Sequence, residues 1–404
     1  MARTSSSIRP ASVTSATLAH VAVRRSVGTP PGVTVAGGCR VPILGDVPGP
    51  YDQSQDDLAT LLGDEPSFRT RQVWDSLYRR VLRPAEMTDL PKELRTELDG
   101  ALPPALSLLD ERSSDSDQTT KWSFRLHDDA VIETVLMHYP DRSTVCVSSQ
   151  AGCAMACSFC ATGQSGFRRH LTSGEILEQV AVASRAARPR RLSNIVFMGM
   201  GEPLANFDNL WRAVERIHGD FGLGARSMTV STVGIIPGIR RLTAAPLPVG
   251  LAVSLHAATE QLRNELVPIN RRYPIPALME ACADYRAETG RRVSFEWAMI
   301  DGVNDDDAQA EQLAGLATRV RAHVNLIPLN PTPGYPVRGT PRARIDAFRS
   351  ILEQRGTTVT IRSTRGSDID AACGQLAAVA DTPAPVALRR RGPERADPGA
   401  AASL

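Results

Sequence analysis

Residues 143–163 read STVCVSSQAGCAMACSFCATG, and this stretch contains four of the seven cysteines in a chain of 404 residues. It opens with a short β-branched run, residues 145–148, which predicts a buried strand. Six further apolar runs follow and alternate with helical patterns such as residues 173–187 and 308–320. The expected strands are residues 195–198, 228–231, 251–255, 293–298, 324–327 and 359–361. Repeated βα units predict a parallel sheet, either doubly wound or closed as a barrel, and periodicity alone does not choose between them.

The cysteines of this stretch have metal-ligand spacing. Cys153, Cys157 and Cys160 form a C-x3-C-x2-C pattern directly after the first strand. Three thiolates in eight residues can hold three irons of a [4Fe-4S] cubane, while the fourth iron keeps an open position for a small ligand. A structural zinc ion is the alternative, and it would need a fourth protein ligand, for which His170 is the candidate.

The remaining cysteines have different settings. Cys146 lies seven residues before Cys153, and Cys373 lies far downstream in RSTRGSDIDAACGQL, residues 362–376. Cys282 fits a buried position inside a helical run, where cysteine packs as a small hydrophobe. An odd number of cysteines without an export signal favours a reducing compartment, so we expect a cytoplasmic protein.

The pattern along the chain divides it into five segments. We expect a disordered extension over residues 1–50, because its first forty-five residues contain no acid and many Ser, Thr and Arg. A small helical domain follows over residues 51–115, and a β-hairpin over residues 116–142. Residues 113–120 read as a polar linker. The α/β domain covers residues 143–378, and a disordered tail covers residues 379–404.

Composition excludes few functions. The net charge is +2, which neither indicates nor forbids a nucleic-acid partner. No apolar run approaches the roughly 18 residues of a membrane span, so we expect no membrane partner. The helical segment carries arginines on its exposed face that can follow a phosphate backbone or simply face solvent. They are Arg69, Arg71, Arg79, Arg80 and Arg83.

Polar residues stand at the expected carboxyl ends of several strands, where ligands bind in parallel α/β sheets. Residues 198–203 read MGMGEP, in which glycines let backbone approach a ligand and Glu202 can accept hydrogen bonds from an ammonium group. Each of these residues, taken alone, is equally typical of a turn or a helix cap. The candidate cofactor-binding set is Gly201, Glu202, Ser231, Ser254, Leu255, His256 and Asn330.

These motifs together resemble a known family. The three cysteines, with Phe159 before the third, resemble the radical S-adenosylmethionine (SAM) superfamily. From about residue 58 to residue 377 the chain is similar to the RlmN family of 23S ribosomal RNA adenine-C2 methyltransferases. The resemblance covers the helical front segment, SSQAGCAMACSFCATG, MGMGEP, SLHA, PLNP and RGSDIDAACGQL. It implies a partial (β/α) barrel with a small N-terminal helical domain.

The resemblance also implies the chemistry. It implies a [4Fe-4S] cluster on Cys153, Cys157 and Cys160, and two SAM molecules per turnover. The first would methylate Cys373, and the second would yield the radical that activates that methyl group for addition to adenine C2. Cys146 would then attack the Cys373 sulfur and release the RNA through a transient disulfide. Glu133 matches the residue that accepts the C2 proton, and Cys146 is its rival for that task.

Partners follow from the same resemblance. We expect 23S ribosomal RNA, transfer RNA beside the anticodon, an electron donor such as flavodoxin, and a monomeric protein. One alternative is the Cfr type, which methylates adenine C8 through the same pair of thiols. A second, from another class, is a non-catalytic RNA-binding protein with a structural metal site. That reading leaves Cys146, Cys373 and Glu202 without a function.

Overall fold

The computed structural model describes residues 49–114, 118–330, 332, 334–335, 337–363, 365–372 and 374–376. The expectations for residues 1–48 and for residues 377–404 therefore lie outside the described residues. None of the helices in the described part is both long enough and apolar enough to cross a membrane.

A ten-stranded sheet organises the described chain. Its order is β1-β2-β3-β4-β7-β8-β9-β10-β11-β12, antiparallel from β1 to β4 and parallel from β4 onward. The sheet stays open, because β4 and β12 stand at opposite ends of the parallel part. The expected partial barrel is confirmed. The parallel strands are β4 (Ser143–Cys146), β7 (Asn194–Phe197), β8 (Met228–Thr232), β9 (Gly250–Ser254), β10 (Ser294–Met299), β11 (His323–Pro328) and β12 (Thr358–Ile361).

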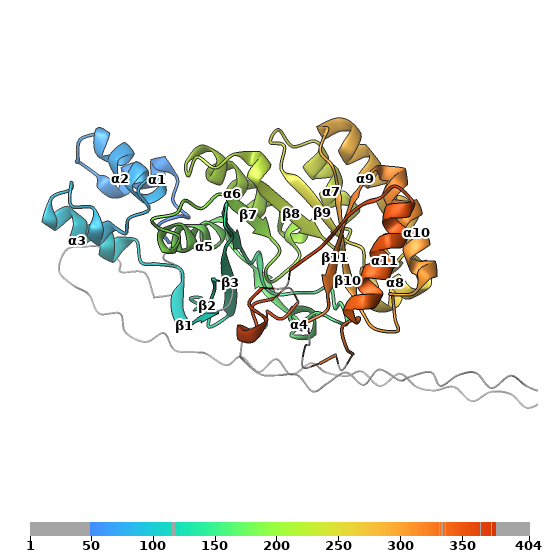
Figure 1. The fold of residues 1–404 in the computed structure, drawn as a ribbon. Coiled ribbons are helices and arrows are strands. Elements are labelled where there is room, and N and C mark those ends of the chain that lie inside the picture. The colour runs from blue at the N-terminus through green and yellow to red at the C-terminus, as the bar shows by residue number, and fades with distance from the viewer. Residues whose placement is uncertain are drawn as a thin grey trace, which may run out of the picture. The chain divides into compact units, whose positions relative to one another are not determined.

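Helices connect the parallel strands, and Figure 1 shows α7, α9, α10 and α11 outside the strands that they join. Several helices begin at a side chain that caps their N-terminus. At α5, for example, Thr172 and Glu175 form a capping box. Phe295 and Trp297, fully buried, pack in the hydrophobic core of the α/β domain. The helices are α5 (Ser173–Ala186), α6 (Phe207–Gly219), α7 (Ile236–Thr243), α8 (Glu260–Leu266), α9 (Ile275–Thr289), α10 (Asp307–Val320) and α11 (Arg342–Gln354). Short 3-10 turns occur at Pro203–Asn206, Ala225–Ser227 and Pro268–Arg271.

The expected strands and helices of the α/β domain agree with the structure to within about two residues. Cys282 is fully buried on α9 among hydrophobic side chains, as its sequence setting predicts. Burial raises the pKa of its thiol to about 12, which keeps it protonated.

The expected linker and hairpin need a correction. Residues 107–114 form a strand, β1 (Ser107–Ser114), which pairs antiparallel with β2 (Thr119–Arg125). The hairpin thus becomes a three-strand unit with β3 (Val131–His138). Sequence periodicity missed β1 because it is an edge strand whose side chains are almost all exposed, so polar residues occupy it without an apolar alternation.

The helical front segment is confirmed as three short helices. They are α1 (Gln55–Leu62), α2 (Phe68–Tyr78) and α3 (Lys92–Ala101), with a 3-10 turn at Pro84–Glu86. Their apolar sides share one core with the α/β domain, as where the ring of Tyr78 meets that of Phe221 edge to face, with centroids 5.1 Å apart. In Figure 1 these helices lie beside α5 and α6.

Candidate active site

The cysteine loop is closed by a small sheet that the sequence did not reveal. Strand β5 (Gln150–Gly152) pairs with β6 (Phe167–His170), and the cysteines lie on the chain between them, before the short helix α4 (Ala161–Gln164). Gly152 has φ +74°, and a Cβ there would stand 2.0 Å from the carbonyl oxygen of Gly166. The neck of the loop therefore needs glycine at this position.

The three cysteine thiols of the loop are sheltered from solvent. Cys153 and Cys157 are buried, and Cys160 is intermediate. Burial raises the pKa of Cys153 to about 12. Burial, followed by the neighbouring Cys160 and Cys153, raises the pKa of Cys157 well above its usual range. Such thiols become thiolates only when a metal centre supplies compensating positive charge.

The thiols do not converge on one point. In the described part of the chain, no three His, Cys, Asp or Glu side chains form a group that could hold a metal ion. His170, the expected fourth zinc ligand, instead has its Nδ1 atom 3.0 Å from the side-chain nitrogen of Gln150. A cubane presents a different iron to each cysteine, so it does not require the thiols to meet at one ion.

A pocket of about 160 Å³ joins the cysteine loop to the carboxyl ends of the strands. All three cysteines line it, with Phe159 of the same loop. Six of the seven expected cofactor residues line it too: Gly201, Glu202, Ser231, Ser254, His256 and Asn330. Leu255 does not; it is fully buried, and its backbone N–H donates to the carbonyl of Glu296.

Glu202 is held rigidly at this pocket. Its two carboxylate oxygens accept backbone N–H groups of Leu204 at 3.1 Å and Val233 at 2.8 Å. Complete burial raises its pKa to about 7, although these hydrogen bonds oppose the shift. A bound ammonium group would favour the ionised form.

The glycines of MGMGEP serve packing as well as the pocket. A Cβ on Gly201, which has φ +103°, would stand 2.5 Å from the Cβ of Gln150. A Cβ on Gly199 would stand 2.7 Å from the backbone of Val147. The turn thus crosses closely over the chain leaving β4, whereas the sequence indicated an approach to a ligand.

His256 contributes a neutral ring. Burial lowers its pKa to about 3, and its Nδ1 accepts the N–H of Ala298 at 3.0 Å. The ring meets Phe159 edge to face, with centroids 4.7 Å apart. Ser231 is also engaged, because its hydroxyl donates to the carbonyl of Phe197 at 2.7 Å. These bonds make the pocket wall rigid.

Sequence reasoning missed two residues that build this site. The Gln150 side-chain oxygen accepts the N–H of Glu202 at 2.8 Å, so it fixes the MGMGEP turn. Arg263 binds backbone carbonyls behind the strand ends. The long-range contacts that reveal these roles leave no local signal in the sequence.

A second pocket adjoins the first and contains Cys146. It is small, about 20 Å³, and shares Met198, Ile327, Asn330 and Arg362 with the cofactor pocket. Cys146 ends β4 opposite Val135 of β3. It therefore lies on the catalytic side of the sheet.

Glu133 also lies within this sheet and is not the exposed strand residue that its sequence setting would allow. It is 1% exposed, and Lys121 Nζ stands 3.2 Å from its Oε1 atom. Lys121 also donates to the backbone carbonyl of Asp370 at 3.1 Å. The ammonium group thus joins β2, β3 and the segment that precedes Cys373.

Comparison with known proteins agrees with this geometry. Residues 147–314 match the model of the radical SAM superfamily. A probable dual-specificity RNA methyltransferase RlmN from Chloroflexus aurantiacus is 50% identical over 345 residues, which cover 81% of this chain and 92% of that protein. Its counterpart from Frankia casuarinae is 52% identical over 341 residues, 81% of each chain. The chain belongs to the RlmN family. A crystal structure of a radical SAM methyltransferase from Sphaerobacter thermophilus is also similar, with 50% identity, a TM-score of 0.79, and coverage of 82% of this chain and 99% of that one.

Membership of the RlmN family makes the chain a radical SAM RNA methyltransferase and implies a [4Fe-4S] cluster and SAM as cofactors. The residues present fit both groups. Three sheltered thiols of one loop can bind the irons, and Glu202 faces the same pocket. Polar groups at the ends of β8, β9 and β11 complete the donor set: Ser231, Ser254, His256 and Asn330.

Cys373, which the RlmN resemblance makes the methyl carrier, lies outside the described residues. Its described neighbours are fixed to two parts of the site. The carbonyl of Gly374 accepts the N–H of Ala161, and the carbonyl of Leu376 accepts the hydroxyl of Thr162. On the other side, Arg365 donates to the carbonyl of His138.

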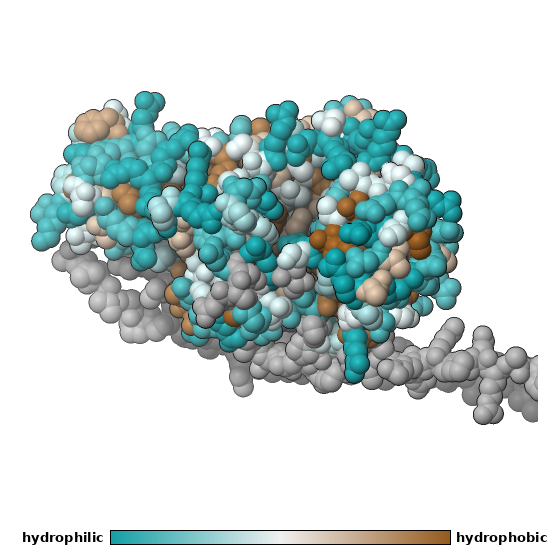
Figure 2. All heavy atoms as spheres, in the orientation of Figure 1, coloured by the Kyte–Doolittle hydropathy of each residue, from teal (hydrophilic) through white to brown (hydrophobic). Residues whose placement is uncertain are grey.

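The arginines of the RlmN front domain are only partly available for RNA. Arg79 donates to the carbonyl of Gly219, Arg80 pairs with Asp89, and Arg69 contacts Glu65. Arg71 and Arg83 are exposed. Figure 2 shows a mainly hydrophilic surface over this domain.

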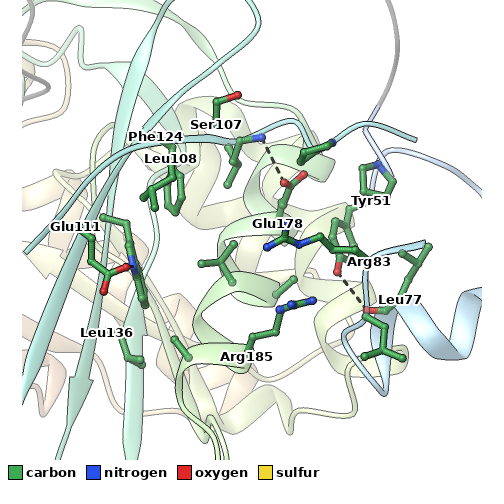
Figure 3. Close-up of a pocket in the computed structure, with 18 of the residues that line it drawn as sticks. Tyr51, Leu77, Arg83, Ser107, Leu108, Glu111, Phe124, Leu136, Glu178 and Arg185 are labelled. Atoms are coloured by element: carbon green, nitrogen blue, oxygen red, sulfur yellow. Dashed lines mark hydrogen bonds between the residues drawn. The ribbon is translucent and has the colours of Figure 1, made fainter. Parts of the chain in front are cut away.

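A cavity of about 640 Å³ lies elsewhere, between the front domain, the three-strand unit and α5 (Figure 3). Two of its charged groups are engaged within the protein. Glu178 accepts the N–H groups of Ala105 and Leu106, and Arg185 pairs with Glu86. We assign no step of the reaction to this cavity.

Proposed function

We propose that this protein methylates C2 of an adenine in 23S ribosomal RNA, and of the adenosine next to the anticodon in transfer RNA. Two SAM molecules are used per turnover. The observation that carries the proposal is the adjacency of two pockets, one lined by Cys153, Cys157 and Cys160 and the other by Cys146. The names of the relatives, dual-specificity RNA methyltransferases, support RNA as the substrate.

The cofactors have a defined place in this proposal. Cys153, Cys157 and Cys160 hold the cluster, and Glu202 binds the ammonium group of SAM. Ser231, Ser254, His256 and Asn330 contact the rest of that molecule. When bound, the cluster and SAM would supply a methyl group and the one-electron chemistry that activates it.

The protein contributes two reactive thiols, a base and a pocket wall that excludes water. Cys373 carries the methyl group, and after addition to C2 a methylene carbon links its sulfur to the base. The Cys146 thiolate attacks the Cys373 sulfur and breaks the bond from that sulfur to the methylene carbon; the two sulfurs form a disulfide, and the released carbon takes up a proton to become the methyl group of the base. Glu133 takes the proton from C2, and its burial beside Lys121 keeps water away from that step. Phe159 and His256 pack together at the pocket and exclude water from it.

Mass spectrometry of nucleosides tests the proposal. Ribosomal RNA treated with the anaerobically reconstituted enzyme should yield 2-methyladenosine. A product of 8-methyladenosine would instead assign the Cfr-type reaction. A colourless protein that contains zinc and methylates no RNA would support the non-catalytic alternative and overturn both.

The remaining partners belong to the same proposal. Ribosomal RNA as the substrate indicates that the protein acts in the cytoplasm. A flavodoxin-like protein would supply the single electrons that the reaction needs. The protein acts as a monomer, because one chain contains all the proposed residues. Transfer RNA modification is checked by the same nucleoside assay with transfer RNA as substrate.

A further inference from the structure

Arg263 is a fully buried cation behind the cofactor pocket. It lies on α8 with an exposed fraction of 0%. Its guanidinium donates to the backbone carbonyls of Val233 at 2.7 Å, Leu255 at 3.1 Å and Ser254 at 3.3 Å. It also donates to the side-chain oxygen of Asn270 at 2.7 Å. All four acceptors are neutral.

This positive charge has no direct counter-charge in the described part of the chain, where no Asp or Glu forms an ion pair with it. The nearest carboxylate in the network is that of Glu260, which is exposed and is reached only through the side chain of Asn270. Buried charges are normally paired, because removing an ion from water is costly. An anion that binds nearby would compensate this charge.

The cysteine loop packs against the same helix. Ser158 donates its N–H to the carbonyl of Leu266 at the end of α8, and Cys157 belongs to a hydrophobic cluster with Leu266 and Val267. Burial lowers the pKa of Arg263 only to about 10, so the guanidinium stays protonated at neutral pH. This fixed cation therefore lies on the helix against which the cysteine loop packs.

We propose that Arg263 supplies the buried positive charge that balances the iron–sulfur cluster and favours its reduced state. Three thiolates make the bound cluster anionic, and reduction adds one more negative charge. A fixed cation in a low-dielectric setting stabilises the more negative state and raises the reduction potential. Arg263 is thus a positioning and electrostatic residue that touches neither substrate nor cofactor. This inference rests on the cluster of the proposed function.

Redox titration of the reconstituted protein, followed by electron paramagnetic resonance, tests it. In Arg263→Gln, the ratio of reduced to oxidised cluster at the wild-type midpoint should fall roughly tenfold, equivalent to about 59 mV. Arg263→Lys keeps the charge and should stay within about threefold of wild type by the same conversion. Arg216→Gln is the matched control, since Arg216 binds the carbonyl of Tyr51 and the hydroxyl of Tyr78 in the front domain.

A second variant covers the case in which Arg263→Gln does not fold or bind iron. Asn270→Asp, made together with Glu260→Gln so that an amide again faces position 270, places a carboxylate beside the guanidinium without removing any of its carbonyl contacts, and it should also lower the reduced fraction. The inference would be overturned if both Arg263→Gln and this double variant kept the wild-type midpoint potential. If Arg263→Gln is unstable, a wild-type midpoint in the double variant alone would overturn it. Arg263 would then serve only to bind the backbone carbonyls around it. A wild-type protein without a cluster would instead overturn the proposed function.

Discussion

The Nζ atom of Lys121 lies 3.2 Å from the carboxylate of Glu133, and their side chains are only 7% and 1% exposed. Breaking a buried pair by removing one partner typically costs about 3 kcal/mol or more, because the other charge remains desolvated. The hydroxyl of Ser123 also donates to Glu133 Oε1, at 3.3 Å.

Lys121→Met should therefore shift the pH dependence of methylation. Without the ammonium group, the Glu133 carboxyl binds its proton more tightly, so it acts as a base only at higher pH. The rate of RNA methylation, measured from pH 6 to pH 9, should reach its plateau at higher pH than in wild type. Lys121→Arg, which restores the charge, should recover most of the wild-type profile, and an unchanged profile in Lys121→Met would contradict the role of the pair.

The pH dependence of SAM binding should follow Glu202. Its pKa is raised from 4.5 to about 7 by burial, and the proposed contact with the ammonium group of SAM requires the ionised form. The ionised fraction rises from about one tenth at pH 6 to about one half at pH 7, where an α-amino group is still mostly protonated, so affinity should increase roughly fivefold over this range. Equilibrium dialysis of SAM against cluster-loaded protein measures it. Glu202→Gln should bind weakly with no such trend; a trend that survives in this variant belongs to another group.

Burial of His256 makes the stability of the fold depend on pH. Its pKa is lowered from 6.5 to about 3 by burial, so the unfolded chain binds the proton more readily than the folded one. The contribution of His256 to stability is complete above pH 6.5 and is lost as the pH falls toward 3. The loss approaches about 1.4 kcal/mol per pH unit, the value for one proton.

Urea unfolding of the cofactor-free protein at pH 7, 6 and 5 checks this expectation. His256→Asn is a suitable variant, because asparagine tolerates the φ of +59° at this position and its side-chain oxygen can accept the N–H of Ala298. Its free energy of unfolding should decline less steeply with acid than that of wild type. Equal slopes would mean that His256 takes up its proton at the same pH in the folded and the unfolded chain.

The parallel sheet was predictable because its strands are short β-branched runs between amphipathic helices. The ends of such strands share one edge, which is why Glu202, Ser231 and His256 were found without knowledge of the fold. Contacts between distant residues could not be predicted in this way. Lys121 reaches Asp370 across 249 positions of the chain, and no local pattern marks either residue.

Glycine positions allow a test of the turn that holds Glu202. Gly201→Ala should destabilise the protein by about 1–3 kcal/mol, because its φ of +103° is strained for any side chain and the added Cβ would overlap Gln150. Gly315→Ala is the control: this residue lies inside α10 with open space around it, and alanine should stabilise the helix by about 0.5–1 kcal/mol. Thermal unfolding of both variants gives the comparison. Similar changes in the two would show that the turn is not under this constraint.

Cys146→Ala should separate methyl transfer from product release. The variant retains the three cluster cysteines and the proposed methyl carrier, but it lacks the thiolate that attacks the Cys373 sulfur. RNA should therefore remain covalently attached to the protein, visible as a nuclease-sensitive shift on denaturing gels. Cys373→Ala is the matched control and should give neither attached RNA nor methylated base. Ordinary turnover by Cys146→Ala would contradict the disulfide step. The RNA would then have to leave the protein without attack by a second thiol.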